Sequence, residues 1–351
     1  MNNERIHDLL NENKNSIARE IVEKQYSLNP KFWSKFGEEG RIKSQKDAAH
    51  HISFLAEAIL LEDSEVFTDY IEWLKLLFKE INLPKESITE TLNITKEILE
   101  NYFTPHEREN IETYISAAIN HVEKPVKQVP SYIDTNAPLG ELAKEFNETL
   151  IKGRKNQASN LILKAVEEGV SIQDIYLNVF QKSQLETGRL WLMNKISVAK
   201  EHYVSAATQM IMSQLYPYIF STERKGLTFI GACVGGELHE IGLRMVSDFF
   251  EMDGWDTYYL GANTPVTTII SAIQEYKADI LGLSIAMPYH QSLVKKNIEE
   301  IRKEITESQT KILVGGNGIN TRRNIWKMLG ADNYAPDARS AINLANKMIQ
   351  Q

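Results

Sequence analysis

Two short stretches place a histidine close to a carboxylate, and in one of them the spacing suits metal binding. In "GELHEIG", residues 236–242, Glu237 stands two residues before His239. A carboxylate there can accept the N–H of one imidazole nitrogen, which fixes the tautomer and makes the other nitrogen a better metal ligand. In "WLMNKISVAKEH", residues 191–202, Trp191 precedes the adjacent pair Glu201 and His202, with nine residues between them. Whether the stretches form one site depends on the elements that carry them.

From residue 225 onward, apolar runs typical of strands alternate with amphipathic runs typical of helices. Five strands are expected at "LTFIGACV", "DTYYLGA", "ADILGLSIAM", "TKILVGG" and "ADNYAP". This alternation predicts a doubly wound, mostly parallel α/β sheet of the flavodoxin-like, Rossmann-like type. Such sheets bind ligands beyond the carboxyl ends of their strands. His239 follows the first strand and is therefore expected in the ligand crevice, although a loop histidine can also cap a helix or lie on the surface.

The first third of the chain has a helical pattern. Residues 4–122 place apolar residues three and four apart, with breaks at "NLPKES" and "FTPHERE". They predict an all-helical domain of about five helices. Three prolines and the absence of a helical period in "EKPVKQVPSYIDTNAPLG" predict an extended connection.

A second helical region follows this connection. Four helical runs joined by short links predict an antiparallel four-helix bundle. Gly153 and Gly169 lie just past the ends of the first two runs, and Ser171 and Ser197 can cap the starts of later ones. The expected organisation is a helical domain, a linker, a bundle and an α/β domain, at residues 1–122, 123–138, 139–220 and 225–351.

Composition narrows the class of function. The net charge is −8, and no cluster of Lys and Arg is present, which argues against a nucleic-acid partner. The N-terminus lacks the layout of a signal peptide, and no apolar run approaches the roughly 20 residues of a membrane span. The single cysteine, Cys233, lies in an apolar strand-like run and fits a buried thiol in a reducing compartment. We expect a cytoplasmic protein with neither membrane nor nucleic-acid partners.

The segment "ELHEIG" resembles the cobalamin-binding motif Asp-x-His-x-x-Gly, with Glu237 replacing Asp and Gly242 closing the motif. The resemblance continues at the ends of the third and fourth predicted strands, in "GLSIA" and "VGGNG", and covers roughly residues 137–351. It implies base-off binding, in which the nucleotide tail is buried beside the sheet and His239 becomes the lower axial ligand of cobalt.

Three further residues take roles from this resemblance. Gly315 and Gly316 permit close approach of the buried tail because they lack side chains, and Ser284 offers a hydroxyl for a polar contact. Without the histidine motif, the glycines read as an ordinary turn and the serine as a cap.

The bundle resembles the cap over the upper face of the corrin in methionine synthase and its relatives. Trp191, Glu201 and His202 match the signature of the CarH-like light-sensing adenosylcobalamin proteins. The resemblance implies that the Trp packs beside the adenosyl group and that the Glu-His pair helps to bind it. Leu192 stands where the DNA-binding regulators have a histidine that ligates cobalt after illumination, so water or His202 would take that position. The competing interpretation of Trp191 is a core aromatic of the bundle.

A helical domain before a cobalamin photosensor core resembles the photocobilins, which also bind biliverdin noncovalently. Four residues are candidates for bilin contact: His50, His51, Tyr70 and Trp73. Core packing at helical spacing explains the aromatic positions equally well, and the histidines can face solvent.

Taken together, the resemblances imply a cobalamin-dependent photoreceptor with adenosylcobalamin, and with biliverdin as a second chromophore. Light would cleave the cobalt–carbon bond and change the cap or the self-association of the chain, a dimer or a light-dependent homo-oligomer. The signal would pass to a separate, unidentified protein, since no catalytic residue and no enzyme domain are predicted. The alternatives are a corrinoid protein that carries methyl groups for a methyltransferase system, and a light-independent cobalamin sensor.

Overall fold

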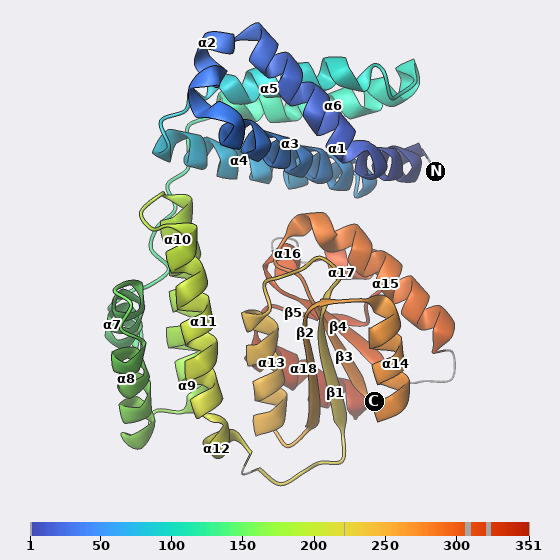
Figure 1. Cartoon of the computed structure of the whole chain (residues 1–351). Coiled ribbons are helices and arrows are strands. Elements are labelled where there is room, and N and C mark those ends of the chain that lie inside the picture. Colours follow the sequence, from blue (N-terminus) through green and yellow to red (C-terminus); the bar gives the residue numbers. More distant parts are fainter. Residues whose placement is uncertain (1, 221, 306–309, 321–323, 351) are drawn as a thin grey trace. The chain divides into compact units, whose positions relative to one another are not determined.

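The computed structural model describes most of the chain, namely residues 2–220, 222–305, 310–320 and 324–350. It consists of two compact units, which divide between Gln128 and Val129. Unit 1 is the part up to Gln128, and unit 2 is the part from Val129 onward (Figure 1).

Unit 1 is a bundle of helices: α1 (Asn2–Leu28), α2 (Pro30–Trp33), η1 (Ser34–Phe36), α3 (Gly37–Leu60), α4 (Glu65–Glu80), α5 (Glu86–Leu99) and α6 (Pro105–Val122). The predicted breaks separate α4 from α5 and α5 from α6. At the second break, Thr104 and Glu107 form a reciprocal capping box around Pro105. The long helices α1, α3, α4, α5 and α6 agree with the prediction of about five, and the short α2, capped by Asn29, and η1 lie between α1 and α3.

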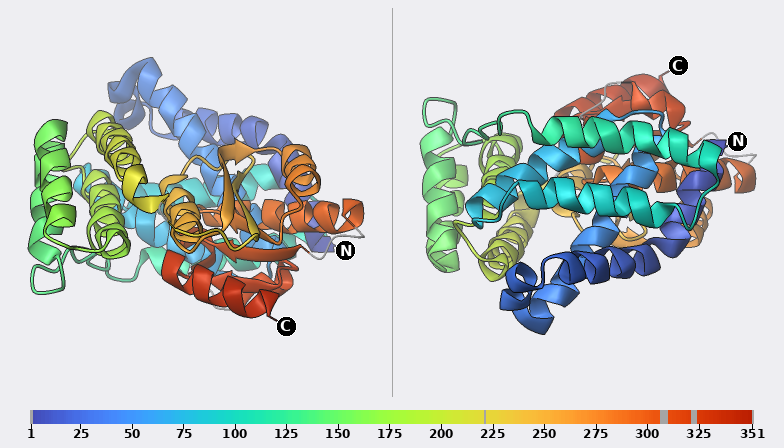
Figure 2. Two further views of the ribbon diagram at one scale, coloured as in Figure 1. Left: turned by 90° about the horizontal axis from the view of Figure 1, so that it is seen from below. Right: turned by 90° about the horizontal axis from the view of Figure 1, so that it is seen from above.

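The core of unit 1 follows from the helical spacing of its apolar residues. Four fully buried side chains of α1 recur at intervals of four and seven: Ile6, Leu10, Ile17 and Ile21. Helix α3 contributes a similar buried row, and the two helices lie side by side (Figure 2). This face excludes water along most of α1, which the polar N-terminal sequence alone does not reveal.

Unit 2 begins with helices: α7 (Gly140–Ile151), α8 (Lys155–Glu167), α9 (Ile172–Ile175), the π-helical turn η2 (Tyr176–Phe180), α10 (Gln181–Leu192), α11 (Val198–Gln214) and α12 (Tyr216–Ile219). Gly153 and Gly169 adopt positive φ just past α7 and α8. The Ser171 side chain accepts the Asp174 N–H at the start of α9. Ser197 caps α11 in the same way. These capping predictions are confirmed.

The rest of unit 2 is a five-stranded, wholly parallel sheet with the order β2-β1-β3-β4-β5. The strands are β1 (Thr228–Val234), β2 (Asp256–Thr264), β3 (Ile280–Ser284), β4 (Lys311–Gly315) and β5 (Asn333–Ala335). Helices flank the sheet: α13 (Ile241–Met252), α14 (Val266–Tyr276), η3 (Pro288–His290), α15 (Gln291–Glu304), α16 (Asn317–Asn320), α17 (Ile325–Met328) and α18 (Ala338–Ile349) (Figure 1). The predicted parallel α/β sheet is confirmed, and its order is the flavodoxin-like one.

The helices before the sheet share one apolar core with it. Phe180 and Tyr176 of η2 belong to the same buried cluster as Phe249 of α13 and Trp255. The Tyr176 hydroxyl donates a 2.8 Å hydrogen bond to buried Asp248, also on α13. These contacts join the helices that precede the sheet to α13, which packs against β1 and β2. Throughout the described ranges, no helix has the length and apolar character needed to span a bilayer.

Candidate functional site

The loop after β1 holds the predicted histidine together with its carboxylate. Gly236 turns the chain with φ of 80°, and its N–H donates to the Asn263 side chain at 2.7 Å. Glu237 then points inward and is fully buried, whereas the His239 side chain is 63% exposed. The distance between His239 Nδ1 and Glu237 Oε1 is 2.6 Å. Because Nδ1 is engaged, Nε2 is the nitrogen that remains for a metal at the edge of the sheet.

Glu237 is also tied to the loop after β3. Its Oε2 accepts the backbone N–H groups of Ala286 and Met287, at 2.8 and 3.1 Å. The same oxygen lies 3.2 Å from Nδ1 of His290, a residue of η3 that is 12% exposed at its side chain. One carboxylate therefore bridges two histidines. The sequence interpretation missed His290, although its place just beyond β3 put it at the same sheet edge as His239.

The electrostatics of this group favour an ionised carboxylate. Burial by itself raises the pKa of Glu237, but hydrogen bonds from His239, His290 and the backbone outweigh burial and hold the pKa well below its usual value. The hydrogen bond to Glu237 raises the pKa of His239 above its ordinary value, and the charge of Glu201 adds to this effect. Glu201 belongs to α11, so the two stretches singled out in the sequence interact electrostatically.

The upper group of predicted residues lies at the facing ends of α10 and α11. Trp191 is half-buried in the last turn of α10. Glu201 stands in the first turn of α11, where its carboxylate lies 2.7 Å from Nδ1 of His202, and the His202 side chain is 75% exposed. The Ser205 hydroxyl also donates to Glu201, at 3.1 Å. The Glu201 carboxylate thus has two partners, Ser205 and His202, and the exposed imidazole of His202 is held by this carboxylate at Nδ1.

The two glycines after β4 lie close to backbone atoms of neighbouring segments. A Cβ on Gly315 would stand 2.8 Å from the carbonyl oxygen of Ala335, and one on Gly316 would stand 2.3 Å from that of Ile285. The protein's own backbone therefore leaves no room for a side chain at either glycine, and their predicted role toward the nucleotide tail stays a prediction. Ser284 ends β3 opposite Gly315 in the strand register.

The last residue of the motif, Gly242, has a simpler environment. It lies in the first turn of α13, and a Cβ there would meet no atom within 4 Å. No contact with the described residues accounts for this glycine, so its predicted role toward cobalamin stays a prediction.

In unit 1 the structure brings three of the four predicted bilin contacts together. His51 is buried, and its Nδ1 lies 2.5 Å from the Tyr70 hydroxyl. Burial lowers the pKa of His51 to about 3, so this imidazole is neutral. The rings of Tyr70 and Trp73 are stacked at 6.0 Å between centroids, whereas His50 is exposed. These contacts are typical of core packing, which is the alternative that the sequence left open. Bilin contact stays a prediction.

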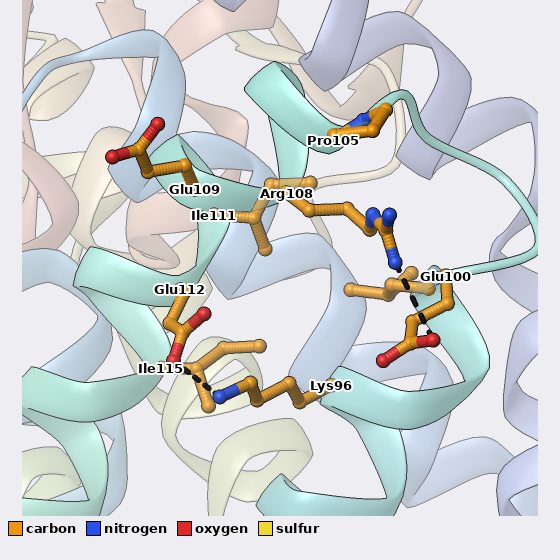
Figure 3. A pocket seen from close by; sticks show the side chains of 9 residues that line it. Lys96, Glu100, Pro105, Arg108, Glu109, Ile111, Glu112 and Ile115 are labelled. Carbon is orange, nitrogen blue, oxygen red and sulfur yellow. Dashed lines mark hydrogen bonds and ion pairs between the residues drawn. The ribbon is translucent and has the colours of Figure 1, made fainter.

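A surface pocket in unit 1 lies elsewhere, between α5 and α6 (Figure 3). Lys96 and Arg108 line it, but each pairs with a carboxylate, Glu112 and Glu100 respectively. Its lining includes none of the four predicted bilin contacts. Across the described residues, no group of three or more His, Cys, Asp or Glu side chains is arranged to hold a metal ion.

Comparison with known families agrees with the geometry at the sheet edge. Residues 227–343 match a B12 binding domain, and residues 142–216 match a second B12 binding domain. Both matches support cobalamin binding by this part of the chain. The two matches include the sheet, His239 and the helices that carry Trp191 and Glu201. Residues 3–122 match a third family, described as phycobilisome protein.

The curated relatives that match this chain are corrinoid proteins. A corrinoid protein of Desulfitobacterium hafniense is 26% identical over 214 residues, which are 59% of this chain and 97% of the relative. Dimethylamine corrinoid protein 2 of Methanosarcina mazei is 24% identical over 222 residues, 60% of this chain and 97% of the relative. The solved structure of the Methanosarcina barkeri monomethylamine corrinoid protein shares the fold, with a TM-score of 0.54 at 18% identity, covering 60% of this chain and 99% of that one.

These relatives fit the methyl-carrier alternative better than the photoreceptor interpretation. They support cobalamin binding without specifying an adenosyl group, light sensing or biliverdin.

Replacing His290 by Ala is expected to weaken cobalamin binding by about 10-fold, because loss of a group that orients a metal ligand typically costs 10–100-fold. Two backbone N–H groups still hold Glu237 in this variant, which favours the lower figure. His290→Asn keeps an N–H near the position of Nδ1 and should restore most of the affinity. Spectral titration with hydroxocobalamin measures both variants. Equal binding by His290→Ala and the parent would show that the backbone alone orients Glu237.

Proposed function

We propose that unit 2 binds cobalamin base-off, with His239 as the lower axial ligand of cobalt. The observation that carries the proposal is the 2.6 Å contact between His239 Nδ1 and a fully buried Glu237, which directs Nε2 away from the carboxylate. This is the pairing of a metal-binding imidazole with its supporting carboxylate. A single imidazole suits a metal that already has its equatorial ligands from an organic ring.

The chain's own residues divide the work at this site. The Glu237 carboxylate accepts the Nδ1–H of His239 and a backbone N–H of the loop after β3. The imidazole of His239 therefore keeps one tautomer. Trp191, Glu201 and His202 would cover the upper face, and Ser284 would contact the nucleotide tail. Bound cobalamin supplies a cobalt centre whose upper position can carry an alkyl group.

The first candidate role is a carrier of methyl groups for a methyltransferase system. The relatives named as dimethylamine corrinoid proteins support it, because the match covers almost their whole length. In this role the upper face would admit a partner protein, the transferase would supply the catalytic residues, and the chain itself would not be an enzyme.

The second candidate role is a light-responsive cobalamin sensor. One observation favours it: residues 3–122 match the phycobilisome protein family and lie outside the corrinoid part of the chain. A pigment such as biliverdin in unit 1 and adenosylcobalamin beside Trp191 would then give two chromophores. Leu192 offers no lone pair for cobalt after loss of the adenosyl group. A homo-oligomer and a separate downstream protein remain part of this second proposal.

Illumination distinguishes the two roles when the conformation of the protein is measured, rather than the cleavage of the cobalt–carbon bond. The full chain is loaded in the dark with adenosylcobalamin or methylcobalamin, and its elution volume is recorded before and after green light. A sensor should prefer the adenosyl form and change its elution volume after illumination. A carrier should bind both forms alike and keep its elution volume, even though both ligands lose their alkyl group.

A further inference from the structure

The peptide segment that joins the two units is hydrogen-bonded at both of its ends. The N–H of Lys127 is held by a side chain of unit 1, and the carbonyl of Val129 is held by a side chain of unit 2. Gln128 is the single residue between them in the sequence. The proline-containing linker predicted at 123–138 therefore includes a stretch with hydrogen bonds to unit 1 at one end and to unit 2 at the other, residues 127–132, here called the joint.

The anchor in unit 1 is the carboxylate of Glu72. Its Oε1 accepts the Lys127 N–H at 2.6 Å. Its Oε2 accepts hydrogen bonds from buried Lys75 at 2.9 Å and from His121 at 2.8 Å. Burial raises the pKa of Glu72, but these hydrogen bonds outweigh it and lower the pKa below its usual value. The carboxylate is thus ionised and fixed, and hydrogen bonds to an ionised acceptor are among the stronger ones.

The anchor in unit 2 is the ion pair of Glu186 and Arg189. Both guanidinium nitrogens Nε and Nη2 donate to Glu186, at 2.9 and 2.6 Å, and both side chains are about a tenth exposed. Glu186 Oε2 also accepts the Tyr132 N–H at 3.0 Å, and Arg189 Nη1 donates to the Val129 carbonyl at 3.4 Å. A bidentate pair of this kind holds its geometry better than a single contact.

The two anchors belong to helices that carry candidate ligand residues. Glu72 lies on α4, which also bears Tyr70 and Trp73. Arg189 lies on α10, two residues before Trp191. We propose that the joint is a coupling element, through which a displacement of α10 changes the stability of α4 and the reverse. The coupling itself does not depend on the proposed function. Its regulatory consequence rests on that function: a change of ligand at Trp191 would alter the stability of α4 in unit 1.

The first test uses the ligand-free full chain and hydrogen exchange. Glu186→Gln removes the bidentate pair and is expected to speed exchange at the Lys127 amide, in unit 1, by about tenfold, the equivalent of one lost hydrogen bond to a charged group. Mass spectrometry of a peptide that ends before Pro130 measures this amide, and a peptide covering α4 reports the helix.

Two insertions form a matched control. Six Gly and Ser residues inserted after Gln128 leave both anchors intact but separate them, and should abolish the effect of Glu186→Gln on Lys127. The same six residues inserted after the exposed Pro125 keep residues 127–132 contiguous and should preserve the effect. The proposal is overturned when Glu186→Gln leaves Lys127 unchanged, or when its effect persists after the insertion at Gln128.

The second test adds hydroxocobalamin to the same variants. In the parent and in the Pro125 insertion, exchange should change both in α10 and at Lys127; in the Gln128 insertion it should change in α10 alone. A response in α10 without one at Lys127 in the parent contradicts the coupling. A missing response in α10 counts against the proposed cobalamin site instead, and the ligand-free result then decides the coupling.

Discussion

Replacing His239 by Ala is expected to remove the nitrogen ligand of bound cobalt and to weaken cobalamin binding by at least about 100-fold. Loss of a residue that only supports a metal ligand already costs 10–100-fold, and loss of the ligand itself should cost more. Because Nδ1 of His239 is held by Glu237, the metal bond falls to Nε2, which Ala cannot replace. Electron paramagnetic resonance of the cobalt(II) complex shows the ligand directly, as a nitrogen splitting that the variant should lack.

The control is another histidine whose loss should have no effect. His106 of unit 1 is exposed and outside the proposed site, so His106→Ala should keep both the affinity and the nitrogen splitting. Labelling the histidines of the parent with ¹⁵N distinguishes imidazole from the dimethylbenzimidazole of cobalamin, because the splitting should change from a triplet to a doublet; an unchanged triplet would mean that the nitrogen belongs to cobalamin and that the base-off assignment is wrong.

The sheet and its ligand edge were predictable because they depend on local sequence patterns. Apolar strands that alternate with amphipathic helices have few possible topologies, and the loop after the first strand must open at the carboxyl edge. Glu237 and His239 are two residues apart, so their contact needs only a turn, and Gly236 supplies it with positive φ. Predictions of this kind need no knowledge of distant partners.

The parts that escaped prediction depend on contacts between distant segments. His290 joins Glu237 across 53 positions of the sequence, and no local pattern marks which side chain of the β3 loop turns inward. The environment of Gly316 likewise comes from the carbonyl of Ile285 on a neighbouring strand end. The joint shows the same limit: proline content predicted an extended linker, but Glu72 and Arg189, which hold it, lie 55 and 60 residues away.

A buried carboxyl group between η2 and α13 should make the stability of unit 2 depend on pH. Asp248 of α13 is 6% exposed and accepts the hydroxyl of Tyr176 from η2. Burial raises the pKa of Asp248 to about 6, and the opposing influence of Tyr176 and Arg244 does not restore the ordinary value. The folded protein therefore holds a proton that the unfolded chain has already lost near pH 4 to 6.

The free energy of unfolding of unit 2 should accordingly fall by up to about 3 kcal/mol as the pH rises from 4 to 7, since a difference of one pKa unit is worth about 1.4 kcal/mol. The stabilisation is fully present below the unfolded pKa of 3.8 and is lost as the pH rises through the folded value of about 6. Asp248→Asn keeps an acceptor for the Tyr176 hydroxyl but cannot ionise, so the difference between parent and variant isolates this group. Urea unfolding followed through exchange of the β1 amides measures this difference.

Asp253 gives the matched control with the opposite sign. Burial alone would raise its pKa, but hydrogen bonds from Lys225 and Asn346 lower it. Its contribution is complete above the unfolded pKa, so Asp253→Asn should show a constant difference above about pH 5. A parent–Asp248→Asn difference that is equally flat across pH 4 to 7 would mean that Asp248 is ionised in the folded protein and that its partners offset its burial.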